Sequence, residues 1–159
     1  MQCQPSDSTL QHHLTVDARK RGIGGALFQL HGIEPHTDAT NSNEHCNVKR
    51  IVHFLSFWLE DAKTRYTNLE REALAVVKGL AEVRWLAVPS RYPIMVYMDH
   101  QALRTLLTGP TNDSHGRIAN WQQRLSEYDM ILIHRFANTH FMGIADGMSQ
   151  LSSHLNSVE

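Results

Sequence analysis

The 159-residue sequence has only two cysteines, no long apolar run and no excess of charge of one sign. Cys3 and Cys46 form no metal-type pair and cannot supply a disulfide framework. No apolar stretch approaches the ~20 residues that a membrane-spanning helix needs. The first eight residues also lack the cationic start and apolar centre of a secretory signal. We therefore expect a protein of a reducing compartment that is not secreted and has no membrane partner.

The net charge of −1 lacks the basic excess of most nucleic-acid-binding domains. Positive residues cluster locally instead, at residues 19–21 and 49–50, where a solvated turn is the alternative interpretation. The eleven histidines form no His-x3-His pair on a predicted helix, so the sequence gives no zinc signature. Residues 31–47, rich in polar side chains, are predicted to be a long exposed loop.

Apolar residues make up 42% of the chain and charged residues 19%, which is typical of a folded domain. The length fits one domain with one core. We predict a disordered N-terminal extension at residues 1–11, a single domain at residues 12–152 and a C-terminal tail at residues 153–159.

Five short segments have the composition of β-strands. The first two, at residues 14–18 and 22–30, flank a basic turn and predict a β-hairpin with Asp17 in its first strand. The others are predicted at residues 51–59, 92–98 and 130–134. The fourth is almost continuously apolar, as in a central strand, and ends at Asp99. A carboxylate such as Asp17 in a buried strand must be hydrogen-bonded, paired or metal-bound, because burying it alone costs several kcal/mol.

Four helices are predicted from apolar side chains at helical spacing, at residues 67–87, 100–107, 118–128 and 143–151. On the first, Glu72 lies about 70° from the centre of the apolar stripe and Glu70 about 90° away on the other side. Spacing therefore favours Glu72 only weakly, and two solvated acids in the first turn remain an alternative. Three strands before any long helix indicate an α/β protein whose mixed sheet begins antiparallel, not a doubly wound fold.

The predicted order is strand-strand-strand-helix-strand-helix-helix-strand-helix, and four of these elements each carry an acid: Asp17, Glu72, Asp99 and Asp146. This arrangement resembles the ribonuclease H fold. The chain is similar to the ribonuclease H domain of reverse transcriptases in the Pol polyproteins of gypsy-class LTR retrotransposons. The matching stretches lie at residues 16–24, 66–75, 97–100, 117–129 and 144–149.

The resemblance implies metal-dependent endonucleolytic cleavage of the RNA strand in an RNA/DNA hybrid. In the family's acid-x-acid motif the second acid is the metal ligand, which maps to Glu72. Crowded carboxylates repel one another unless cations neutralise them, and oxygen-only ligands select hard ions. The implied site holds two Mg²⁺ ions, with Mn²⁺ as the alternative, and Asp17 bridges them.

The same resemblance implies contacts with nucleic acid. Asn68 and Gln101 match positions that touch the minor groove, where 2′-hydroxyls distinguish RNA from DNA. A helix cap for Asn68 and a surface amide for Gln101 remain alternatives. The basic turn formed by Arg19, Lys20 and Arg21 becomes a candidate contact with the phosphate backbone.

The sequence departs from the family pattern at three points. Phe136 stands where many ribonucleases H have a histidine before the last acid, and His134 and His140 are out of register with it. Gln150 replaces the arginine that usually ends the last motif. No Tyr-x-Asp-Asp polymerase motif occurs.

Two hypotheses follow from these features. In the first, the chain is the ribonuclease H part of a retrotransposon polyprotein and acts on RNA/DNA hybrids. Its partner is then the polymerase domain of that polyprotein, and it lies in a cytoplasmic retrotransposon particle or in the nucleus. In the second, it is a catalytically silent, decayed or domesticated copy that binds nucleic acid or serves structurally.

Overall fold

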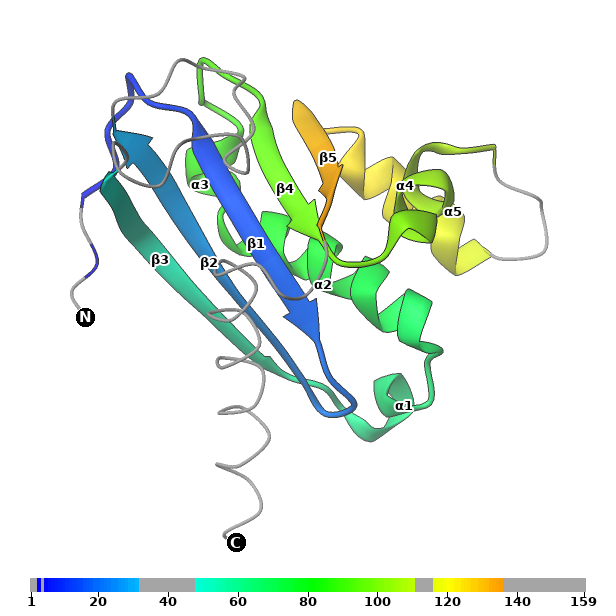
Figure 1. Ribbon diagram of the computed structural model, residues 1–159. Coiled ribbons are helices and arrows are strands. Elements are labelled where there is room, and N and C mark those ends of the chain that lie inside the picture. Colours follow the sequence, from blue (N-terminus) through cyan, green and yellow to red (C-terminus); the bar gives the residue numbers. More distant parts are fainter. Residues whose placement is uncertain (1–2, 4, 32–47, 111–115, 136–159) are drawn as a thin grey trace, which may run out of the picture.

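The computed structural model describes residues 3, 5–31, 48–110 and 116–135, and the structural statements that follow refer to these ranges (Figure 1). Their strands form one mixed sheet in the order β3-β2-β1-β4-β5. The strands are β1 (His12–Ala18), β2 (Gly22–His31), β3 (Val48–Trp58), β4 (Ile94–Met98) and β5 (Met130–His134). The helices are α1 (Asp61–Thr64), α2 (Asn68–Glu82), α3 (Arg84–Ala87), α4 (Gln101–Thr108) and α5 (Gly116–Leu125).

The sheet combines an antiparallel half with a parallel half. β1, β2 and β3 pair antiparallel in chain order, whereas β4 pairs parallel with both β1 and β5. The hairpin predicted around Asp17 is confirmed, and its turn is closed by the Arg19 amide, which donates to the Gly22 carbonyl at 2.7 Å. The predicted α/β class with an antiparallel start is likewise confirmed.

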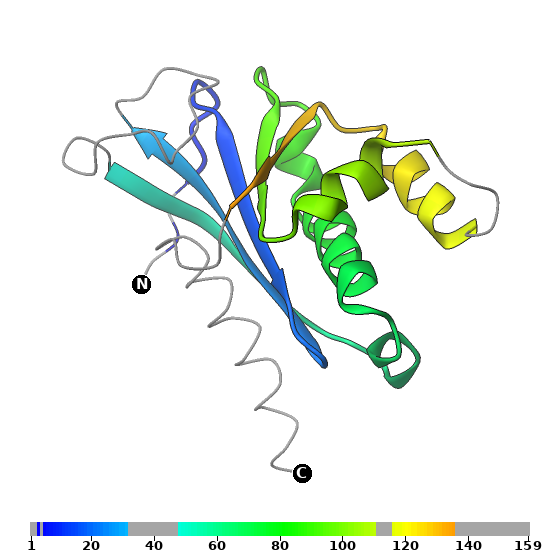
Figure 2. The ribbon, with the colours of Figure 1, turned by 45° about the vertical axis from the view of Figure 1, so that its right-hand side comes forward.

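Helices α2, α4 and α5 lie on one face of the sheet, as the turned view shows (Figure 2). α2 packs directly on β1, and the core between them is fully apolar: Leu14, Val16, Val76 and Leu80 are each at most 1% exposed. Gly79 permits this close approach, since a Cβ atom there would lie 2.9 Å from Cγ1 of Val16. The contact fixes the height of α2 above the sheet.

A second apolar cluster lies on the other face of the sheet and includes Phe28, Met95 and Tyr97. His13 joins it, because its Nδ1 is hydrogen-bonded to the Tyr97 hydroxyl at 2.8 Å and its ring stacks on Phe28. β1 and β4 are therefore buried on both sides, as the apolar run of the fourth predicted strand indicated.

The first long helix differs from its prediction. It was expected to run unbroken over residues 67–87, but α2 ends at Glu82 and the separate turn α3 follows. Val83 leaves helical geometry with a ψ of 12°, and its amide donates to the carbonyls of Gly79 and Ala81. No glycine or proline marks this position. The periodic apolar pattern alone therefore predicted a helix that continues past its actual end. The short helix α1 was not predicted.

Some predictions concern residues at the ends of the chain. Part of segment 1–11, predicted to be disordered, is hydrogen-bonded to β2: the Gln29 side chain accepts from the Asp7 amide at 2.8 Å and donates to the Asp7 and Leu10 carbonyls. The predicted loop at 31–47 and the predicted helix at 143–151 lie outside the described residues, apart from His31, which ends β2. The proposed domain boundaries stay a prediction. Within the described ranges, none of the helices combines the length and apolar character needed to cross a bilayer.

The close packing at Gly79 yields a test of the fold. We expect Gly79→Val to lower the free energy of unfolding by about 1–3 kcal/mol, because the added side chain overpacks the α2–β1 contact. Urea denaturation followed by circular dichroism measures the change. Gly116→Ala is the matched control, since nothing lies within 4 Å of a Cβ atom there. An equal loss in both variants would contradict this account of α2 packing.

Candidate metal centre

Three acids from three elements meet at one end of the sheet. Asp17 lies in β1, Glu72 in the first turns of α2, and Asp99 directly after β4. One carboxylate oxygen from each lies within 4.8 Å of the other two. Asp17 and Glu72 are each only 7% exposed, so the cluster is set into the protein and not on its surface.

The register of the sheet brings the two aspartates together. β1 and β4 run parallel, and their last paired residues are Thr15 and Tyr97. Asp17 and Asp99 each follow two residues later, so both reach the same level where the strands end. The carboxyl ends of adjacent parallel strands are a common location for binding and catalytic residues.

The structure distinguishes the two acids of α2. Glu70 forms a capping box with Thr67 and a salt bridge with Arg117 at 2.8 Å. The hydrogen bonds from Thr67, and then the Arg117 charge, lower the pKa of Glu70. Glu72 instead lies among the aspartates, and its Oε1 accepts the Ala18 amide at 3.3 Å. Glu70 is therefore a helix-start acid, whereas Glu72 is part of the cluster.

The buried acids are short of hydrogen-bond donors. Among the described residues, Oε2 of Glu72 and Oδ1 of Asp99 are buried without a hydrogen-bond partner. Burial, then the charges of Asp99 and Asp17, raise the pKa of Glu72 to about 8. Clustered carboxylate oxygens without other partners are the kind of ligand that hard divalent cations prefer. The residues present therefore fit Mg²⁺ or Mn²⁺.

Two basic side chains border the cluster. Arg19 Nε donates to Oδ2 of Asp17 at 3.2 Å, so this residue of the basic turn neutralises an acid. His134 Nε2 is hydrogen-bonded to the Asp99 backbone carbonyl at 3.0 Å. His134 pairs with Met98 in the β4–β5 register, and the Arg135 amide donates to the Met98 carbonyl at 2.8 Å. The end of β5 therefore holds the turn that carries Asp99. The sequence analysis did not predict this structural role of His134, because it compared His134 only with the family's histidine position, which Phe136 occupies.

The other predicted nucleic-acid contacts surround the cluster on exposed positions. Lys20 and Arg21 are exposed in the β1–β2 turn, and Gln101 is exposed as the first residue of α4. Asn68 is exposed as the first residue of α2, one turn before Glu72, and its Oδ1 accepts a hydrogen bond from Arg71. The helix-cap alternative for Asn68 is wrong, because Thr67 is the cap.

The fourth predicted acid, Asp146, lies outside the described residues, as do His140, Phe136 and Gln150. The structure therefore brings together three of the four predicted ligands and leaves the placement of the fourth as a prediction.

Residues 7–128 match the model of the RNase H-like domain found in reverse transcriptase. The match covers most of the chain and includes all three clustered acids. The chain belongs to this family of RNase H-like domains.

The curated relatives are polyproteins of mobile elements. The chain is 27% identical over 150 residues to the retrovirus-related Pol polyprotein from transposon opus of Drosophila melanogaster. It is 24% identical over 157 residues to the transposon Tf2-3 polyprotein of Schizosaccharomyces pombe. Each match covers 94% of this chain but only 13% and 11% of the respective polyprotein. The retrotransposon resemblance is thus confirmed, and the gypsy class stays a prediction.

Solved structures agree on the fold. LC11-RNase H1, isolated from compost by a metagenomic approach, matches with a TM-score of 0.62 at 14% identity. The match covers 94% of this chain and 99% of the LC11-RNase H1 chain. The foamy viral protease-reverse transcriptase in complex with RNA/DNA hybrid matches with a TM-score of 0.61 at 13% identity, over 87% of this chain and 17% of its own. These likenesses confirm the ribonuclease H fold.

The raised pKa of Glu72 gives a pH test of the metal-free protein. In the folded state Glu72 keeps its proton up to about pH 8, whereas its ordinary pKa is 4.5. Its contribution to stability is therefore present below about pH 4.5 and is lost as the pH rises through 8. We expect Glu72→Gln, which mimics the protonated acid, to flatten this decline. The urea midpoint, measured in chelator from pH 5 to 8, reports the effect.

Glu70→Gln is the control for this pH series, because Glu70 has a lowered pKa and lies outside the cluster. It should keep the decline between pH 5 and 8. An unchanged slope in Glu72→Gln would show that Glu72 is not the group that stays protonated.

Proposed function

We propose that this chain is a metal-dependent endonuclease that cleaves the RNA strand of RNA/DNA hybrids, as the ribonuclease H part of a retroelement polyprotein. The observation that carries the proposal is the convergence of one carboxylate oxygen each from Asp17, Glu72 and Asp99 within 4.8 Å. Two buried oxygens of this cluster have no hydrogen-bond partner among the described residues. Membership of the family of RNase H-like domains found in reverse transcriptase supports the choice of substrate. The fold alone would not, since one fold carries many activities.

In this proposal Asp17, Glu72 and Asp99 hold divalent cations. Asp146 is the fourth ligand, which we assign because it matches the last acid of the family pattern. When bound, two Mg²⁺ or Mn²⁺ ions would activate the attacking water and stabilise the leaving 3′ oxygen. The protein supplies the rest of the chemistry by position. β1 and β4 fix two carboxylates, α2 supplies the third, and His134 holds the Asp99 turn through its backbone carbonyl.

The exposed polar residues around the cluster suit a hybrid substrate. Lys20 and Arg21 lie on the turn next to Asp17 and are placed to contact a phosphate backbone. Asn68 and Gln101 begin the two helices that carry or follow the acids Glu72 and Asp99. Amide side chains there can hydrogen-bond to 2′-hydroxyls, which is the basis for choosing the RNA strand. We further propose the polymerase domain of the same polyprotein as a partner.

Cleavage is tested with a labelled RNA/DNA hybrid in Mg²⁺. We expect wild type to cut the RNA strand, and Asp17→Asn and Asp99→Asn to lower the rate by more than about 100-fold. This estimate follows because even mutation of residues that only hydrogen-bond to metal ligands lowers metal affinity or activity by about 10–100-fold. Loss of a ligand itself should cost more. Glu70→Gln, two residues from Glu72, is the matched control and should retain activity. An inert wild type that still binds the hybrid would favour the catalytically silent module, which the departures at Phe136 and Gln150 keep as the second hypothesis.

Metal binding has a readout that does not depend on cleavage. A ligand that binds only the folded state stabilises it by about 2.7 kcal/mol at 100 times its Kd. We expect Mg²⁺ to raise the Tm of wild type and to have little effect on Asp17→Asn. Ca²⁺ serves as a second hard cation for comparison. Equal shifts in wild type and Asp17→Asn would place the bound ion elsewhere.

A further inference from the structure

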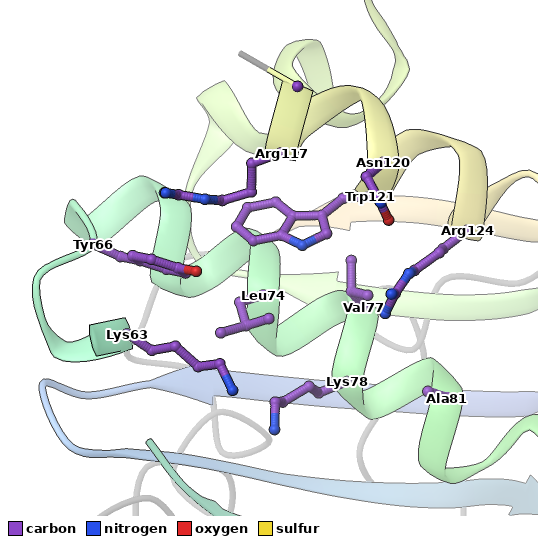
Figure 3. Close-up of a pocket in the computed structure, with 11 residues that line it drawn as sticks. Lys63, Tyr66, Leu74, Val77, Lys78, Ala81, Arg117, Asn120, Trp121 and Arg124 are labelled. Atoms are coloured by element: carbon purple, nitrogen blue, oxygen red, sulfur yellow. The ribbon is translucent and has the colours of Figure 1, made fainter. Parts of the chain in front are cut away.

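A groove separate from the acid cluster opens between α1, α2 and α5 (Figure 3). Its volume is about 580 Å³, and it runs along the outer side of α2 beneath α5. Four basic residues line it: Lys63, Lys78, Arg117 and Arg124. Among the described residues no acid lines it, although the chain as a whole carries a net charge of −1.

The groove lies on the opposite side of α2 from the acid cluster. Leu74, Val77, Lys78 and Ala81 contribute the α2 wall. At about 100° per residue these positions fall roughly 140–240° around the helix axis from Glu72. A stiff duplex seated on the acid cluster would therefore have to pass around α2 to fill the groove. This geometry favours an occupant other than the hybrid substrate.

The positive charges of the groove are unequally neutralised. Arg117 pairs with Glu70 at 2.8 Å and lies over the Tyr66 ring, and Lys63 pairs with the exposed Glu60 at 3.1 Å. Lys78 and Arg124 form no salt bridge within the described part of the chain. Burial and then the neighbouring Lys63 lower the pKa of Lys78, and the charge of Glu60 offsets only part of this effect. An anion bound beside Lys78 and Lys63 would relieve the repulsion between these two ammonium groups.

The floor of the groove is apolar. Trp121 and Leu74 form it, with Val77 beside them and the small side chain of Ala81 at one end. An apolar floor between basic rims suits a polypeptide that carries both carboxylates and apolar side chains. A sugar-phosphate backbone has the charge but offers less apolar surface than leucine-type side chains to cover this floor.

We propose that this groove binds an acidic, amphipathic segment from another domain of the same polyprotein. Its carboxylates pair with Lys78 and Arg124, and its apolar side chains rest on the floor at Trp121. The curated relatives extend far beyond the matched region, since the chain spans only 11–13% of their length. A tethered domain has a high effective concentration, so a shallow groove is sufficient for docking. The choice of partner rests on family membership, but the groove itself does not depend on the proposed nuclease activity.

Binding is tested first with a synthetic peptide of about 14 residues, with leucines at helical spacing and glutamates elsewhere. Fluorescence anisotropy is measured in chelator and without nucleic acid. We expect wild type to bind this peptide, to bind it more weakly at high salt, and not to bind a matched peptide with lysine in place of glutamate. The double variant Lys78→Glu/Arg124→Glu should weaken binding by about tenfold or more, because like charges then face one another.

Three further variants separate docking from other effects. Ala81→Trp should block the groove without changing its charge, at an exposed helix position that tolerates a larger side chain. Arg91→Glu, in the loop after α3, changes the charge elsewhere and should bind as wild type. Asp17→Asn should also retain peptide binding, so that a failed nuclease and a failed docking site remain separate results.

The source of the occupant is tested in the longer polyprotein of the same element. Lys63 and Lys78 should be protected from an amine-acetylating reagent there and reactive in the isolated chain, with Lys20 as the exposed reference. Reactive Lys63 and Lys78 in the polyprotein would overturn the proposed partner. Absence of peptide binding by wild type, unchanged binding by the double variant, or displacement of the peptide by an RNA/DNA hybrid would overturn the docking site itself.

Discussion

The crowding of three carboxylates, two of them buried and one half-buried, is the constraint that organises this molecule. Carboxylate oxygens of Asp17, Glu72 and Asp99 lie within 4.8 Å of one another, and the nearby Arg19 pairs only with Asp17. Burial, and then the charges of Asp99 and Asp17, raise the pKa of Glu72. A fold that merely needed stability would not keep such a group, since a packed apolar side chain is cheaper to bury. The apolar packing of α2 on β1 holds the acids together against their mutual repulsion.

Much of the site could be predicted from the sequence because the relevant signals are local. Asp17 interrupts an apolar strand, and Asp99 ends one, so both stood out without any knowledge of contacts. Glu72 was harder, because helical spacing placed it at the edge of the apolar stripe with Glu70 almost equally placed on the other side. The family motif chose Glu72, and the structure shows the physical difference: Glu70 is taken up by Thr67 and Arg117.

Other features could not be predicted because they depend on contacts between distant segments. The break at Val83 has no glycine or proline to mark it. The hydrogen bond from His134 to the Asp99 carbonyl depends on the register of β5 against β4. The basic groove joins Lys63, Lys78 and Arg124 from three helices, and none of these residues is unusual by itself. Helix packing creates this groove, whereas two strand ends and the start of one helix create the acid cluster.

The parallel pairing of β1 with β4 also has a consequence for how the protein acquires its shape during synthesis. His13 pairs with Met95, so more than half of the chain must leave the ribosome before the first strand gains this neighbour. The hairpin of β1 and β2 can form early, because its contacts are local. Until β4 arrives, one edge of β1 remains open to pairing with other chains. A nascent chain that stalls between these strands would thus expose an unpaired strand edge, which can pair with other chains, and would have no assembled acid cluster.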